Sequence, residues 1–109
     1  MTPADNTDKT DLSSRDYIFP DSNSRYLTDE DLSGYSSDQL ELAKNEIYAR
    51  HGRKFVTQRI ADYFNSKSWY KGTVEPETFD ADTSVFNEYE VANIQKIADT
   101  EGKLRSEGK

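Results

Sequence analysis

The chain has 109 residues with a net charge of −7, 33% hydrophobic residues, one histidine and no cysteine. This length allows one small domain, and the lack of cysteine excludes disulfides, thiolate catalysis and cysteine-ligated metal sites. The acidic balance disfavours nucleic-acid binding, because the overall field repels phosphate. The 7 Tyr, 5 Phe and 1 Trp are nevertheless too many aromatic residues for a wholly disordered chain, so part of it must fold.

The polar start of the chain, residues 1–16, is predicted to be a disordered linker, because it has too few apolar side chains to offset the entropy of ordering. The apolar stretch from Tyr17 to Pro20 ends at a proline, which favours an edge strand or an extended arm packed on the domain. Thr28, with Asp31 three residues later, predicts one helical turn that ends at Gly34.

The strongest local signal predicts a helix over residues 37–51. Ser36 can cap it, and Gln39 can reach back from the third helical position to complete a capping box. Leu40, Ala43 and Ile47 follow at spacings of three and four, so they share one face. Gly52 supplies the stop signal at the C-terminal end.

Thr57 predicts a second helix over residues 58–66, joined to the first by a short corner that Phe55 is placed to fill. Residues 73–84 are predicted to form an irregular loop, with at most one short strand. Asn87 and Glu90 repeat the capping box and predict a last helix, which ends near Gly102. Its expected apolar stripe consists of Val91, Ile94 and Ala98, with Ile97 adjoining.

These elements predict a mainly α fold, in which about three helices and a short extended N-terminal segment make one small domain. We place the domain at residues 17–102 and expect residues 103–109 to form a frayed tail.

Tyr48, Ala49, Arg50, His51 and Gly52 stand consecutively at the end of the first long helix. This pentapeptide resembles the signature of the YARHG domain, a bacterial family named for it. The similarity runs from about Ser24 to Ala98 and includes Asn45, Glu46, Ile47, Arg53, Phe55, Tyr63, Phe64, Trp69, Tyr70, Asn93 and Ile94. It implies a presumed extracytoplasmic domain without established activity, often carried by membrane-anchored envelope proteins and sometimes beside a zinc ribbon.

The resemblance therefore implies a location at the bacterial cell surface, with the domain tethered in the full-length protein. The sequence given has no apolar run near the roughly 20 residues of a membrane helix, so we expect no direct membrane insertion by these residues. Its first nine residues also lack the basic and apolar regions of a signal peptide.

The motif residues have structural interpretations of their own. His51 falls within about 40° of Leu40 and Ile47 on the helix, so we expect it to bond a carbonyl or carboxylate at the edge of the core. Arg50 is expected to hold a carboxylate, such as one in the last helix, and Gly52 to take positive φ. Asn45 and Asn93 are mid-helix amides, which we expect to tie neighbouring loops to their helices.

Catalytic and metal-binding motifs are weak in this sequence. A Ser–His–acid hydrolase would need the lone His51, and no Gly-x-Ser-x-Gly elbow is present. Zinc sites usually need at least two His or Cys ligands. A calcium loop starting at Asp21 fails because Tyr26 and Leu32 occupy the positions that need Gly and Glu. We therefore expect no enzyme activity, no cofactor and no metal site.

Charge is uneven along the chain: residues 35–72 carry net +3, whereas residues 1–31 and 73–109 each carry net −5. The cations of this basic middle lie close to an aromatic pair, and the candidate ligand-binding set is Arg50, Arg53, Lys54, Arg59, Trp69 and Tyr70. The leading hypothesis is that this basic corner binds an anionic or glycan cell-wall component. A solvated face paired with acids is an equal alternative for the cations, and packing is favoured for the aromatic pair. The alternative function is a protein-interaction or spacer domain of the envelope.

Overall fold

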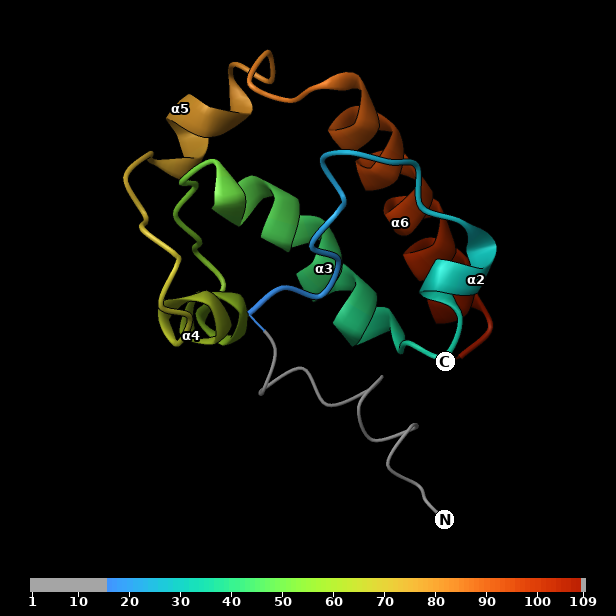
Figure 1. Cartoon of the computed structure of the whole chain (residues 1–109). Coiled ribbons are helices and arrows are strands. Elements are labelled where there is room, and N and C mark those ends of the chain that lie inside the picture. The colour runs from blue at the N-terminus through green and yellow to red at the C-terminus, as the bar shows by residue number, and fades with distance from the viewer. Residues whose placement is uncertain (1–15, 109) are drawn as a thin grey trace.

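The structure is a computed structural model that describes residues 16–108, and its described part is mainly helical without a named strand, as predicted. The helices are α2 (Asp29–Leu32), α3 (Ser37–Arg50), α4 (Gln58–Asn65), α5 (Pro76–Asp80) and α6 (Glu88–Ser106). Figure 1 shows α3 at the centre, with α6 along one side, α2 near its start and α4 and α5 towards its end. The predicted linker lies outside the described residues, apart from Asp16.

The helix starts follow the predicted capping chemistry. Thr28, Ser36 and Asn87 each cap a helix through the backbone N–H of the third helical residue, whose side chain bonds back to the cap. These reciprocal bonds satisfy two otherwise unpaired N–H groups at each start. Thr57 also precedes a helix, but it makes no side-chain cap bond.

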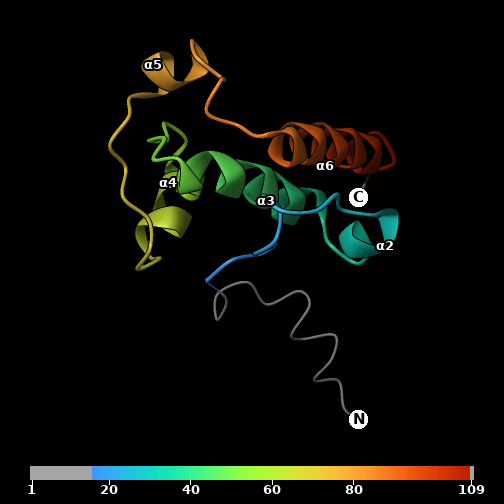
Figure 2. The same cartoon turned by 45° about the horizontal axis from the view of Figure 1, so that its top comes forward.

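The antiparallel pair of α3 and α6 forms the frame of the domain (Figures 1 and 2). His51, just after α3, bonds Glu90 at the start of α6. At the other end, Arg105 near the end of α6 pairs with Asp38 and Glu41 of α3. Both ends of the pair are therefore tied by polar contacts.

The core lies between this pair and the segment that precedes α2. Leu40, Ala43 and Ile47 are buried on α3 as predicted. On α6 the buried face is centred on Asn93 and Ile97, while Val91, expected in the stripe, is 54% exposed. The buried face of α6 is therefore rotated about the helix axis relative to the predicted stripe. The prediction considered only apolar residues, whereas the buried face includes the amide of Asn93.

The segment 16–27, here called the arm, is irregular rather than a strand, and residues 20–24 within it form turns. Of the two predictions for its start, the packed arm is confirmed, because Ile18 and Phe19 are buried in the core. Figure 2 shows the arm (blue to cyan) running along the α3–α6 pair before it reaches α2. No strand lies beside it in the described residues, so its backbone groups bond within its own turns, as Ser22 N–H does to the Phe19 carbonyl, or to side chains.

A second cluster fills the corner between α3 and α4. Phe55 stacks on Phe64 with 5.0 Å between ring centroids and packs against the buried cluster of Ala49, Ile60 and Phe64, as expected for a residue that fills the corner. Residues 73–84, predicted as irregular, instead contain α5. Pro76 begins that helix with a favourable φ angle, and buried Phe79 anchors it to the domain.

The last helix extends beyond its predicted end, so the expected frayed tail is wrong for residues 103–106. Gly102 is inside α6 and does not end it. Leu104 packs against the core and Lys44 pairs with Glu101, so tertiary contacts offset the low helix propensity of glycine.

The two glycines at Gly102 and Gly52 should respond oppositely to alanine. A Cβ at exposed Gly102 would meet nothing within 4 Å, so Gly102→Ala should raise the free energy of unfolding by about 0.5–1 kcal/mol. Gly52 has φ +92° and its Cβ would lie 2.7 Å from Thr73 Oγ1, so Gly52→Ala should lower it by at least about 1 kcal/mol. Urea denaturation measures both changes, and effects of the same sign would contradict the helix end described here.

Candidate functional site

The YARHG pentapeptide closes α3 and turns the chain into the corner. Gly52 adopts positive φ, as predicted, and its carbonyl accepts bonds from the N–H groups of Thr73 and Val74, both at 2.9 Å. The Lys54 N–H donates to the Val74 carbonyl at 2.9 Å. The corner is therefore fixed to the segment that leads into α5.

His51 bonds a carboxylate, as the sequence predicted. Its Nε2 lies 2.8 Å from Oε2 of buried Glu90, and its ring meets Phe86 edge-on. The other oxygen of Glu90 accepts the Asn87 N–H in the capping box of α6. One carboxylate thus joins the end of α3 to the start of α6.

Arg50 does not hold a carboxylate of the last helix, so that prediction is wrong. Its guanidinium donates to the Pro20 carbonyl at 3.0 Å and lies 4.6 Å from the centroid of the Tyr17 ring. The nearby acid of α6, Glu90, is bonded to His51 instead. Arg50 therefore ties the arm to α3.

Glu46 is the main structural residue that sequence reasoning passed over. Its side chain is almost completely buried on α3 and accepts the backbone N–H groups of Ile18 at 2.6 Å and Phe19 at 3.0 Å. Burial raises the pKa of Glu46 to about 7, although the two backbone bonds and the charges of Arg50 and Lys67 act in the opposite direction. The available signal was an acid beside Ile47 and three residues after Ala43, at the edge of the apolar face.

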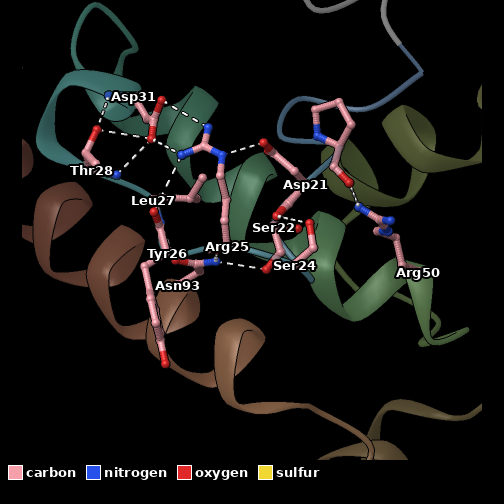
Figure 3. A network of polar contacts seen from close by, with 11 residues as sticks. Asp21, Ser22, Ser24, Arg25, Tyr26, Leu27, Thr28, Asp31, Arg50 and Asn93 are labelled. Carbon is pink, nitrogen blue, oxygen red and sulfur yellow. Dashed lines mark hydrogen bonds and ion pairs between the residues drawn. The ribbon is translucent and has the colours of Figure 1, made fainter.

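Asn93 ties the arm to α6, as predicted. Its Oδ1 accepts the Leu27 N–H at 2.8 Å, and its Nδ2 donates to the carbonyls of Ser22 and Arg25, each at 2.8 Å. Asn45 does not hold a loop, because its Nδ2 donates to the Glu41 carbonyl of its own helix. Figure 3 shows Asn93 reaching the arm from α6 while Arg50 approaches from α3.

Arg25 organises the outer side of the arm. Its guanidinium lies between Asp21 and Asp31 and donates to both carboxylates (Figure 3). The Arg25 bond and the Thr28 N–H hold the pKa of Asp31 well below its usual range. These three side chains are partly exposed, so their ion pairs are expected to fix the geometry of the arm and to add little stability.

The predicted basic corner is neutralised from within the domain. Arg53 pairs with Asp80 through two nitrogens, both at 3.0 Å. Lys54 pairs with Glu75 at 2.6 Å, and Arg59 pairs with Glu41 at 2.5 Å. Acids of α3, α5 and the loop before α5 therefore compensate these cations, which is the arrangement of the solvated-face alternative.

The aromatic pair of the corner is engaged in packing. Trp69 stacks on Tyr17 with 4.8 Å between centroids and donates from Nε1 to the Asp16 carbonyl at 2.6 Å. The Tyr70 hydroxyl donates to the Arg53 carbonyl at 2.6 Å. The two side chains thus hold the arm and the corner, and a role in binding remains a prediction.

An open recess lies beside the first residue of the motif. Tyr48, Phe79 and Phe86 form a triangle with centroid separations of 5.5 to 6.0 Å. They line a recess of about 390 Å³ together with Asp80, Thr83, Val91, Ile94 and Gln95. Burial, with the nearby charge of Asp80, raises the pKa of the Tyr48 phenol. We call this recess the Tyr48 groove, and the sequence analysis did not predict it.

Two further classes of feature are absent from residues 16–108. No group of three or more His, Asp or Glu side chains is arranged to hold a metal ion there. None of the helices in that range combines the length and apolar character that crossing a bilayer requires.

The fold and the corner define a small helical domain whose signature residues hold its own chain together. The model of the YARHG domain family matches residues 15–102, so this chain belongs to the YARHG domain family. The YARHG domain is a presumed extracytoplasmic domain of unknown function. Neither a curated protein nor a solved structure matches the chain at a significant level.

The two mid-helix asparagines should differ sharply in their effect on stability. Asn93→Leu leaves the buried Leu27 N–H and two carbonyls without partners, so it should lower the free energy of unfolding by about 3 kcal/mol. Asn45→Leu, the matched control, should change it by no more than about 0.5 kcal/mol. Equal effects in urea denaturation would contradict the role given to Asn93.

Glu46 should give stability a defined dependence on pH. Its pKa rises from an ordinary 4.5 to about 7, so the folded protein keeps a proton that the unfolded chain has lost between these values. The contribution of Glu46 to the free energy of unfolding therefore falls as pH rises through this window, by on the order of 3 kcal/mol.

The comparison with Glu46→Gln isolates this effect. The variant cannot titrate and offers one acceptor for two N–H groups, so it should be less stable than the parent at pH 5. The difference should shrink by pH 8. Urea denaturation at both values measures it, and a difference that grows with pH would show that the ionised carboxylate is the favoured form.

Proposed function

We propose that this domain is a non-catalytic protein-interaction module of a tethered bacterial envelope protein, and that it binds its partner at the Tyr48 groove. The observation that supports this proposal is the contrast between the motif and the groove. Arg50, His51 and Gly52 are committed to contacts within the domain, whereas the aromatic recess beside them is open. Open apolar recesses with few polar groups are the usual form of binding sites.

The geometry around the lone histidine favours a non-catalytic role. Within the described residues, the hydrogen-bond partner of the His51 ring is the carboxylate of Glu90, and no hydroxyl group bonds to it. A nucleophile activated by histidine needs a hydroxyl or thiol within hydrogen-bond reach. His51 is therefore better suited to joining two helices than to moving protons.

An anionic or glycan ligand at the basic corner has less support. Arg53, Lys54 and Arg59 each have an acid within ion-pair distance, so binding an anion there would compete with existing contacts. The stacking face that Trp69 turns to Tyr17 is also occupied. A variant of the basic corner can nevertheless be compared with a variant of the Tyr48 groove in one binding experiment.

Two variants of the full chain separate the proposals. Arg53→Glu with Lys54→Glu reverses the charge of the corner, and Val91→Ser removes an exposed apolar side chain from the groove without adding charge. We expect cross-linking in envelope extracts to capture a protein partner that persists after glycan digestion. The amount of partner captured should be unchanged in the corner variant and should fall several-fold in Val91→Ser.

Binding to purified peptidoglycan fragments or teichoic-type polymers, titrated at low and high salt, provides the opposing measurement. Saturable, salt-sensitive binding that the corner variant abolishes would overturn the proposed function and restore the basic corner. Circular dichroism of both variants checks that their helices are intact.

A further inference from the structure

The wall of the Tyr48 groove carries an unusual charge pattern. Residues 72–95, which supply most of the groove, contain six acids and no Lys or Arg. Three of these acids are engaged within the domain: Arg53 pairs with Asp80, Lys54 pairs with Glu75, and buried Glu90 is hydrogen-bonded to the His51 ring. The remaining three, Glu77, Asp82 and Glu88, are exposed and form no ion pair within the described part of the chain.

These three acids belong to the segments that border the groove. Asp82 stands between two lining residues, Asp80 and Thr83, and accepts bonds only from Ser84. Glu77 precedes lining residue Phe79 by two positions on α5. Glu88 follows Phe86 by two at the start of α6 and accepts a bond from the Tyr26 hydroxyl at 2.9 Å. The segments that form the aromatic floor thus also carry acids that have no cation partner.

The apolar surface continues past the recess. Val91, on its wall, is 54% exposed, and Val85, adjacent in the chain to Phe86, is 47% exposed. Both valine side chains are therefore partly open to solvent. An occupant that covered them would remove apolar area from water.

We propose that the Tyr48 groove binds a cationic peptide segment of a partner protein, in which one large apolar side chain fills the groove and flanking Lys or Arg residues face Glu77, Asp82 and Glu88. This inference rests on the proposed function and adds the chemistry of the partner. The apolar side chain supplies the anchor, and the complementary charges supply orientation and a faster encounter.

The chain's own terminal segments fit this occupant poorly. Residues 1–15 contain three Asp against one Lys and one Arg, and their one large aliphatic residue is Leu12. At the C-terminal end, Leu104 packs against the core and Arg105 pairs with Asp38 and Glu41, so this part is also engaged. The corner cations of a second copy, Arg53, Lys54 and Arg59, are paired with acids of their own domain. A separate cationic segment therefore complements the groove better than these parts of the chain do.

The test uses the full chain labelled with ¹⁵N and three nine-residue synthetic peptides. The first has a central Trp between two Lys and two Arg residues, with Gly and Ser elsewhere. The second replaces the four cations with Glu, and the third replaces the Trp with Ser. We expect only the first peptide to shift the amide signals of Tyr48, Phe86 and Val91 saturably, with an affinity that weakens as salt increases.

Matched variants locate the charge effect. Glu77→Gln, Asp82→Asn and Glu88→Gln together should raise the Kd of the first peptide roughly tenfold. Asp16→Asn, Glu30→Gln and Asp62→Asn remove the same charge from exposed acids that do not line the groove, so they should leave Kd within about twofold. Glu30 and Glu77 both lie in the first turn of a helix, so each set contains an acid at a helix start.

The outcomes distinguish this inference from the proposed function. Equal shifts with the acidic peptide, or equal effects of the two variant sets, would overturn the cationic partner while leaving the groove as an apolar site. Shifts that grow with protein concentration in the absence of peptide would assign the groove to a second copy and overturn it as well. No shift by any peptide at millimolar concentration would also overturn it, while envelope cross-linking would still test the proposed function.

Discussion

The fold depends on how the arm, a segment without regular structure, satisfies its backbone inside the core. A buried N–H or carbonyl without a partner costs about as much as a lost hydrogen bond. Glu46 of α3 accepts two of the arm's N–H groups, and Asn93 of α6 bonds three further backbone groups of the same segment. These two side chains supply hydrogen-bond partners that a neighbouring strand would supply in a sheet. Ile18, Phe19 and Leu27 can therefore be buried between helices.

The signature pentapeptide belongs to the same system of contacts. Arg50 holds the carbonyl of Pro20, His51 holds Glu90 of α6, and Gly52 directs the chain towards α5. Each of these residues joins elements that are distant in sequence. The motif thus sets the geometry of the corner, and the adjoining aromatic triangle of Tyr48, Phe79 and Phe86 is held in place as a consequence.

The local signals in the sequence predicted the helix starts well and the tertiary contacts only in part. Capping boxes at Ser36 and Asn87 depend on residues three apart, so the sequence alone determines them. The buried face of α6 and its extension past Gly102 depend on packing against α3 and the arm, which local periodicity does not encode. The candidate site shows the same division: the bond between His51 and a carboxylate was predictable, whereas the partners of Arg50 and the buried role of Glu46 were not. The Tyr48 groove joins residues from three separate segments and has no local signature.

Native-state hydrogen exchange of the Ile18, Phe19 and Leu27 amides tests the central claim most directly. These amides lie outside helices, yet each donates to a side chain of α3 or α6 in the core. They should exchange only with opening free energies close to those of the buried middle of α3, because releasing them requires the arm to leave the helix pair. Exchange at rates typical of an exposed loop, with α3 still protected, would contradict the claim that the arm is an integral part of the core.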